Sequence, residues 1–343
     1  MAQNGRIRVA VDAMGGDYAP EEIVKGAVLA AEKDDVQIFL VGPAAILEKE
    51  LAKYKLTNGS SVHVVGASEF IKENESPVDV IRRKRDCSVA VAAKMVKSGE
   101  ADALFSAGSS GAAAISAIQF IGMLDGVYRP ALVGSLGSFA SNTVMVDLGA
   151  NVDCKPHQFL AFAIAGSVYA KTFLNIADPK IALLSTGSEE TKGNEAVREA
   201  YSLLKNSGLN FIGNIEGGDI LNGKANVVIC DGFVGNVLLK FYESIGGRAQ
   251  VWTERKLRKY PPLRALAGLL FKRLFPATRI SSETEKQGGG ILWGVNGVVK
   301  IAHGASRAPQ IANAIESAKE AVKAGVVESM KSELAKFNQG GRL

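Results

Sequence analysis

Residues Val227–Lys240, VVICDGFVGNVLLK, predict a buried strand, a polar loop and the start of a helix, in that order. The first four residues are apolar and mostly β-branched, as in a strand that is buried on both faces. Asp231 ends this run, and Gly232 and Gly235 predict a tight turn in which the backbone comes close to a ligand. We expect a helix to begin near Val237. Free N–H groups at such a junction favour an anion, above all a phosphate group.

The same order of strand, polar loop and helix recurs along the chain. Five further segments show it: Val9–Asp17, Ala103–Ala112, Val144–Asp153, Ile181–Asn194 and Val298–Ser306. Because the carboxyl ends of parallel strands share one edge of a sheet, we expect these loops to converge on a single crevice. The alternation of strands and helices predicts an α/β fold with three layers, in which helices cover both faces of a mostly parallel sheet.

Length and composition limit the possible architectures of the chain. The chain has 343 residues, of which 47% are hydrophobic, and this is enough for a substantial core. We expect one large α/β/α domain over residues 1–335, in one piece or as two lobes around a cleft, and a flexible tail over residues 336–343.

Several classes of protein are disfavoured. The longest apolar stretches, such as Phe159–Ala170, are too short to span a bilayer, and the N-terminus does not resemble a secretory leader. Cys87, Cys154 and Cys230 show neither paired spacing nor a metal-binding pattern, so packing explains them better than nucleophilic catalysis does. We therefore expect a cytoplasmic protein without disulfides or a bound metal ion.

Positive charge is concentrated in one segment. Residues Glu254–Arg279 contain eight cations and one acid, a local charge of +7, whereas the whole chain carries only +5. The basic character is therefore no sign of a general affinity for nucleic acid. We expect residues 251–280 to be an inserted, basic, amphipathic helical segment. A second basic run, Arg82–Arg85, predicts either a solvated helix face or a contact with an acidic partner or phosphate.

The apolar residues of this segment recur at close to helical spacing and are flanked by cations. That arrangement favours a helix lying in the headgroup region of an anionic membrane, and the alternative is a helix buried in the core or in a dimer contact. The residues expected to contact the membrane are Leu263, Leu266, Leu270, Phe271, Leu274, Lys272 and Arg273.

The loops themselves limit the chemistry. The chain lacks GxSxG, GxxxxGK[ST] and HExxH motifs, and no GxGxxG follows the first strand. What remains is a set of Gly, Asn and Ser residues with a few Lys and Asp, which suits binding phosphate and stabilising an oxyanion. If phosphate is the nucleophile, no protein nucleophile is needed, and an acyl thioester is a suitable electrophile because its thiolate leaves readily.

Six motifs, in order, resemble the bacterial phosphate acyltransferases of phospholipid synthesis. They are DAMGGDYAP (Asp12–Pro20), SAGSSGA (Ser106–Ala112), DLGANVDCKP (Asp147–Pro156), TKGNE (Thr191–Glu195), DGFVGNVLLK (Asp231–Lys240) and GVNGVVKIAHGAS (Gly294–Ser306). The resemblance extends from about Arg8 to Glu333. One departure is Ser109-Ser110, where the family usually has Asn-Thr.

The resemblance implies transfer of an acyl group from acyl carrier protein to inorganic phosphate, without a cofactor. The acyl phosphate product would serve a downstream glycerol-3-phosphate acyltransferase. The resemblance also implies a homodimer, peripheral membrane association, and a three-layer fold related to phosphotransacetylases and isocitrate-type dehydrogenases.

Polar residues in these loops are the candidates for catalysis. We expect Lys192 and Asn236 to polarise the thioester carbonyl or bind phosphate, with help from Asn194; alternatively, Lys192 pairs with a neighbouring glutamate and only orders its loop. His303 is expected either to bind phosphate or shuttle a proton, or to be a structural hydrogen-bonding group. The residues expected to bind substrate or phosphate are Asp12, Gly15, Gly16, Asp17, Gly108, Ser109, Ser110, Asp147, Asn151, Lys155, Asp231, Gly232 and Gly235. The aspartates among them follow strands, where such residues often only cap turns.

The sequence is also compatible with three other functions. The first is a phosphotransacetylase that uses a short acyl group on coenzyme A. The second is a nicotinamide-dependent decarboxylating dehydrogenase, for which the sequence lacks an arginine cluster with a metal-binding aspartate pair. The third is a binding module for membranes or nucleic acid, which would leave the six polar loops without a role.

Overall fold

The computed structural model describes residues 6–32, 35–55, 61–71, 75, 83–135, 140, 142–259 and 289–339. The strands are β1 (Ile7–Asp12), β2 (Val36–Gly42), β3 (Val62–Gly66), β4 (Ala103–Ser106), β5 (Ala131–Ser135), β6 (Val144–Val146), β7 (Ile181–Leu184), β8 (Phe211–Ile215), β9 (Val227–Ile229), β10 (Gly290–Trp293) and β11 (Val298–Ile301). The helices are α1 (Glu21–Ala31), α2 (Ala44–Leu51), α4 (Ser88–Ser98), α5 (Ser110–Ser116), α6 (Pro156–Phe173), α7 (Glu195–Lys205), α8 (Gly217–Leu221), α9 (Gly232–Lys256), α12 (Ala308–Lys323) and α13 (Val326–Gln339). A π-helical turn, η1 (Ala117–Ile121), follows α5, and a 3-10 turn, η3 (Leu257–Lys259), follows α9.

Within the described ranges the strands form one 11-stranded sheet in the order β3-β2-β1-β4-β11-β10-β5-β6-β9-β7-β8. Most neighbouring strands are parallel, but β10 is antiparallel to both β11 and β5, and β5 is antiparallel to β6. As a result β6, β9, β7 and β8 run in the direction opposite to β1, β4 and β11. The sheet therefore has two halves of opposite strand direction, joined by β10 and β5.

This reversal corrects the expectation that all six loops share one edge. The loops after β1, β4 and β11 do share an edge, and so do the loops after β6, β9 and β7. The two sets leave the sheet at opposite edges, because the three antiparallel pairings reverse the chain between them.

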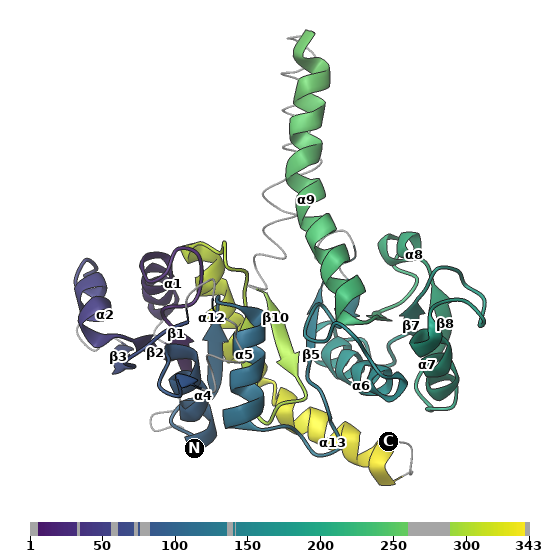
Figure 1. The fold of residues 1–343 in the computed structure, drawn as a ribbon, viewed down its shortest axis with the longest axis horizontal. Helices are drawn as coiled ribbons and strands as arrows, with labels where there is room; N and C mark the ends of the chain where they lie inside the picture. The colour runs from purple at the N-terminus through teal and green to yellow at the C-terminus, as the bar shows by residue number, and fades with distance from the viewer. Residues whose placement is uncertain are drawn as a thin grey trace.

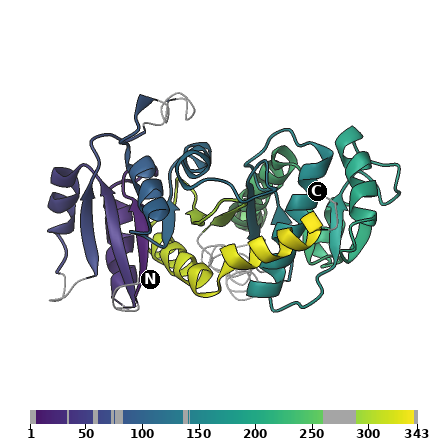
Figure 2. The same ribbon diagram turned by 90° about the horizontal axis from the view of Figure 1, so that it is seen from below.

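Two hydrophobic cores cover the two faces of the sheet. One contains Val9, Phe105 and Phe159 and lies beneath α1, α2, α6, α7, α12 and α13. The other contains Leu104 and Val228 and lies beneath α4, α5, α8 and α9. Neighbouring strand residues alternate between the cores, as the pleat requires. Figures 1 and 2 show the helices on either side of the sheet, and this confirms the predicted three-layer α/β/α arrangement.

Helix α9 differs from the prediction in where it begins. It starts at Gly232, directly after Asp231, rather than near Val237, and its far end projects well beyond the sheet (Figure 1). Residues 251–259 of the predicted basic segment are helical, since they belong to α9 and η3. The rest of that segment, including every residue predicted to contact a membrane, lies outside the described residues.

The C-terminal helix α13 continues to Gln339, so the first residues of the predicted tail are helical. None of the helices in the described part of the chain combines the length and the hydropathy needed to cross a bilayer.

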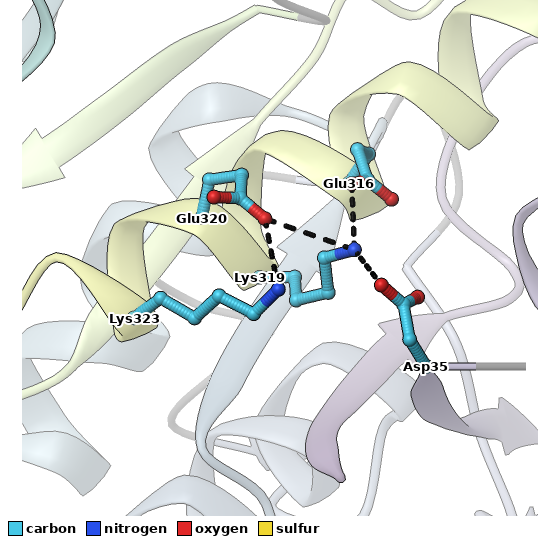
Figure 3. A network of polar contacts seen from close by, with 5 residues as sticks. All are labelled: Asp35, Glu316, Lys319, Glu320 and Lys323. Carbon is cyan, nitrogen blue, oxygen red and sulfur yellow. Dashed lines mark hydrogen bonds and ion pairs between the residues drawn. The ribbon is translucent and has the colours of Figure 1, made fainter. Parts of the chain in front are cut away.

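A buried lysine fixes α12 against the N-terminal half of the sheet (Figure 3). The Lys319 ammonium lies 2.5 Å from Asp35 Oδ2, just before β2, and 2.6 Å from Glu316 Oε1. Glu320 lies 3.7 Å from the same ammonium and 3.2 Å from Lys323. Lys319 itself is 1% exposed, so these carboxylates, rather than water, stabilise its positive charge. This network holds in place the helix that follows the loop after β11.

Candidate active site

A cavity of about 450 Å³ lies at the carboxyl ends of β1, β4 and β11. Three loops line it, namely those that follow these strands, and α4, α9 and nearby loop residues complete the wall. The predicted site residues on its surface are Asp12, Gly15, Gly16, Asp17, Gly108, Ser109, Ser110 and His303. The structure therefore brings together eight residues that come from three separate sequence motifs.

Asp12 is the buried anchor of this cavity. Its carboxylate accepts hydrogen bonds from Ser88 Oγ at 2.6 Å and from Ser106 Oγ at 2.7 Å. Burial raises the pKa of the Asp12 carboxyl above its ordinary range, and the two hydroxyls partly offset this effect. Asp12 thus joins β1, α4 and β4, and its role is to position the loops around it.

The glycines bring backbone to the cavity surface. A Cβ on Gly15 would lie 2.5 Å from Asp12 Oδ2 and 2.8 Å from the backbone nitrogen of Gly108, so only glycine fits there. Gly16 has a φ of +117°, a conformation that other residues rarely adopt. The Asp17 N–H donates to the carbonyl oxygen of Gly304 at 2.9 Å, which ties the first loop to the one after β11.

The polar side chains around this glycine backbone can bind an anion. Ser109 and Ser110 contribute hydroxyls, His303 an imidazole, and Lys240 of α9 an ammonium group. Within the described ranges, no cluster of three or more His, Cys, Asp or Glu side chains is arranged to hold a metal ion. The arrangement suits phosphate binding by hydroxyls, backbone and a cation.

Asp147 and Asn151, from the opposite half of the sheet, do not line this cavity. The Asp147 carboxylate accepts hydrogen bonds from the backbone of Leu132, Gly149, Ala150 and Asn151, and from Asn151 Nδ2, at 2.7 to 3.1 Å. Burial raises its pKa, and these donors partly offset the effect. Both residues are buried, and their polar groups organise the loop after β6.

The structure also gives a role in the fold to Asp231, Gly232 and Gly235. Asp231 Oδ1 accepts from the Val234 N–H at 2.8 Å and so caps α9. A Cβ on Gly232 would lie 2.5 Å from the carbonyl oxygen of Asn151, and one on Gly235 would lie 1.9 Å from that of Asp147. The predicted turn at these glycines is therefore wrong: they lie in the helix and let it pack against the loop after β6.

Lys192 and Asn194 lie in the loop between β7 and α7, and neither lines the cavity. Asn194 Oδ1 caps α7 by accepting from the Val197 N–H at 2.9 Å. Glu190 pairs with Lys205 at 3.1 Å rather than with Lys192. Among the described residues, the Lys192 ammonium has no hydrogen bond or ion pair, so it is available to a ligand.

Asn236 and Lys155 lie in two other cavities. Asn236, one turn into α9, lines a cavity of about 90 Å³ that also touches Ser110 and His303. Helix α9 therefore links the two halves of the sheet. Lys155 lies with Arg129 and His157 in a separate cavity of about 490 Å³ at the start of α6.

The sequence did not predict four polar residues that line the cavity at β1, β4 and β11, namely Glu75, Ser88, Ser106 and Lys240. Glu75 forms an ion pair with Lys84 at 2.8 Å. Ser106 and Lys240 fall at the ends of two quoted motifs, and their positions beside glycine loops were the available signal. Ser88 belongs to no motif, because it reaches Asp12 only through the packing of α4 on the sheet.

A buried lysine next to the site predicts a pH-dependent stability. Lys300 of β11 is 2% exposed and donates to the carbonyl oxygen of Gly289 at 2.7 Å. Burial lowers its pKa from 10.5 to about 7. Between these two pH values the unfolded chain binds a proton that the folded chain does not, so this residue makes stability rise with pH. Below about pH 7 both states are protonated, and the destabilisation is present in full.

We therefore expect the Lys300→Met variant to be more stable than the wild type near pH 7, by a margin that shrinks as the pH rises. The margin should fall by about 1.4 kcal/mol per pH unit above pH 7, since one proton is involved. Urea unfolding of both proteins at three pH values between 7.5 and 9.5 measures it. A margin that does not change with pH would contradict a neutral Lys300 in the folded protein.

Comparison with known proteins supports one family. Residues 7–329 match the family described as "Fatty acid synthesis protein". The phosphate acyltransferase of Pelotomaculum thermopropionicum is 42% identical over 335 residues, which cover 98% of this chain and 97% of that protein. The phosphate acyltransferase of Nostoc sp. is 44% identical over 331 residues, which cover 95% of this chain and 96% of that protein.

Solved structures share the fold at low sequence identity. A phosphotransacetylase from Streptococcus pyogenes has a TM-score of 0.61 and 18% identity, and covers 95% of each chain. The EutD phosphotransacetylase from Staphylococcus aureus has a TM-score of 0.57 and 16% identity, over 93% of this chain and 94% of that one. The predicted relation to the phosphotransacetylase fold is thus confirmed. From the family match and the identity over nearly its whole length, we conclude that the chain belongs to the fatty acid synthesis protein family, the family of the phosphate acyltransferases.

Proposed function

We propose that this acyltransferase moves a long-chain acyl group from acyl carrier protein to inorganic phosphate. The product, an acyl phosphate, would be consumed by a glycerol-3-phosphate acyltransferase in phospholipid synthesis. The observation that carries the proposal is the cavity at β1, β4 and β11, which combines glycine backbone, the hydroxyls of Ser109 and Ser110, His303 and Lys240. These groups suit phosphate binding, and the described residues that line the cavity include no cysteine. The Asp12 carboxylate already accepts hydrogen bonds from two hydroxyls.

In the proposed reaction, a phosphate oxygen attacks the carbonyl carbon of the thioester. The carbonyl π electrons move to oxygen, and the resulting tetrahedral oxyanion collapses with cleavage of the C–S bond. The thiolate leaves on acyl carrier protein, and a new C–O–P linkage remains. No protein nucleophile takes part, so positioning of phosphate and stabilisation of the oxyanion account for the catalysis.

We assign phosphate binding to Gly15, Gly16, Ser109 and Ser110, and stabilisation of the oxyanion to Asn236 and Lys192. Asn236 touches the small cavity that includes Ser110 and His303, which supports its placement beside the carbonyl group. Lys192 follows β7 and Asn236 follows β9, and these two strands are parallel neighbours. Both strands end at the edge of the sheet opposite to the phosphate cavity, and Asn236 reaches the small cavity because α9 extends towards it. The proposed role of Lys192 rests on its ammonium, which makes no hydrogen bond or ion pair among the described residues. Asn194 assists by capping α7 and fixing the loop that carries Lys192.

We also propose that the protein is a homodimer in the cytoplasm. Phe233, Val237 and Phe241 recur at every fourth residue of α9 and are 61%, 53% and 63% exposed. Side chains four residues apart share one face of a helix, so these three form an apolar stripe on a helix that projects from the sheet. A second copy of the same helix would bury this stripe.

Peripheral membrane association is proposed from the sequence of the basic segment. We expect the double variant Leu266→Glu, Leu270→Glu to bind anionic vesicles more weakly, because it places two negative charges on the apolar face. Activity toward a soluble donor should survive. Cosedimentation with vesicles that contain phosphatidylglycerol measures the binding. Undiminished binding of the double variant would refute the membrane role of these leucines.

The proposed donor is tested against its alternative, a short-chain acyl-coenzyme A. Phosphate-dependent thiol release is measured with palmitoyl-acyl carrier protein and with acetyl-coenzyme A under the same conditions. The proposal predicts a higher kcat/KM for the long-chain donor. A preference for acetyl-coenzyme A would instead identify a phosphotransacetylase.

A further inference from the structure

The small cavity beside the phosphate site is mostly apolar, and it continues from the polar cavity. Both cavities are lined by Ser110, Lys240, Ala302 and His303, so they meet at these residues. The remaining lining of the small cavity is Leu132, Gly134, Ser135, Leu148, Asn236, Leu239, Gly289, Gly290 and Ile301. One end is therefore polar, and the rest consists of leucine, isoleucine and glycine, with Ser135 and Asn236 as its two polar residues.

The floor of the small cavity is one face of the sheet. Leu132 and Gly134 are two residues apart on β5, so they lie on the same face, and Gly290 of β10 pairs with Ile301 of β11. A Cβ on Gly134 would lie 2.8 Å from Leu148 Cδ1, and one on Gly290 would lie 2.7 Å from Leu132 Cδ1. Glycine at these positions leaves room for the leucine side chains that form the walls.

Helix α9 forms the roof of this cavity through Asn236, Leu239 and Lys240. Asn236 and Leu239 are three residues apart and therefore lie on the same side of the helix. Leu239 is buried, with 7% of its surface exposed, and it belongs to the core beneath α9. The residue next to it, Leu238, is only partly buried and does not line the cavity.

We propose that this cavity is the subsite for the acyl carbons next to the thioester carbonyl, and that Leu239 sets how well they fit. The inference rests on the proposed function and adds to it the place of the acyl chain. Phosphate occupies the polar cavity, the chain enters the apolar one, and the carbonyl carbon lies where the two meet, beside Ser110 and His303. The cavity volume of about 90 Å³ is about three times the volume that one water molecule occupies in liquid water. The cavity therefore holds only the first few carbons of the acyl chain.

The test replaces Leu239 by phenylalanine, which fills the cavity, and by alanine, which enlarges it. Leu238→Phe is the matched control, since it makes the same substitution one residue away from the cavity. For each folded variant, kcat/KM for phosphate-dependent thiol release is measured with acetyl-, butyryl- and palmitoyl-acyl carrier protein. A melting curve shows that each variant is folded.

Leu239→Phe should lower kcat/KM for the butyryl and palmitoyl donors by about tenfold or more relative to the acetyl donor, as expected when a pocket loses room for methylene groups. Leu239→Ala should not produce this shift, and Leu238→Phe should keep the wild-type ratios. An equal loss with all three donors, or unchanged ratios in Leu239→Phe, would overturn the subsite. Absence of release by the wild type with every donor would overturn the proposed function instead.

Discussion

Replacement of Lys192 by alanine is expected to slow phosphate-dependent thiol release by about a hundredfold or more, which is the effect of removing one donor to an oxyanion. The expectation follows from two observations. The ammonium has no hydrogen bond or ion pair among the described residues, and its loop follows β7, the parallel neighbour of the strand that leads into α9 and Asn236. A lysine that served only to order its loop would need a partner there, and the neighbouring Glu190 pairs with Lys205 instead.

The control for this prediction is Lys205→Ala. It removes the ion pair between Lys205 and Glu190, and Glu190 belongs to the same loop as Lys192. Because exposed ion pairs contribute little, typically below about 1 kcal/mol, this variant should turn over nearly as fast as the wild type. Wild-type rates in Lys192→Ala would remove the lysine from the mechanism and direct attention to His303. Equal losses in both variants would indicate that order in the loop, rather than the ammonium, limits the rate.

Replacement of Gly235 by alanine is expected to destabilise the fold by about 3 kcal/mol or more. A Cβ at this position would lie 1.9 Å from the carbonyl oxygen of Asp147 and 3.1 Å from Cys230 Sγ. Both neighbours are held in place, the first by the loop after β6 and the second in the core. Overpacking of a buried site costs about 1–3 kcal/mol and more where backbone must move, and here the contact is with backbone.

The matched control is Gly218→Ala in α8, where a Cβ would meet no atom within 4 Å. Alanine favours the helix over glycine by about 1 kcal/mol, so this variant should be as stable as the wild type or more so. Urea unfolding of the three proteins measures the differences. Similar midpoints for Gly235→Ala and Gly218→Ala would show that α9 does not pack closely against the loop after β6.

The layers of the fold were predictable from the sequence, but the direction of half the sheet was not. Apolar strands that alternate with amphipathic helices specify helices on both faces, and this holds for α1, α2, α4 and α7. The reversal depends on β5 and β10, two short strands that carry no mark of their direction. One signal was present: Asn296-Gly297, between β10 and β11, is the dipeptide typical of a tight hairpin, and hairpins join antiparallel strands.

The candidate site was predicted in part. The glycine and serine motifs after β1 and β4, with His303, do meet at one cavity, because parallel neighbouring strands bring their loops together. The structural roles of Asp147 and Asp231 could not be predicted in this way. A carboxylate after a strand can face a ligand or accept local N–H groups, and only the fold shows that these two accept N–H groups.

The most direct test of the proposed chemistry is release of free thiol from palmitoyl-acyl carrier protein, with and without inorganic phosphate. Hydroxylamine is added only after the thiol has been measured and the unreacted thioester has been removed, and it then traps the acyl product. Direct attack by phosphate predicts thiol release that requires phosphate and an equal amount of acyl hydroxamate. Thiol release at the same rate without phosphate would contradict the account, because the thioester would then be attacked by water or by a group of the protein.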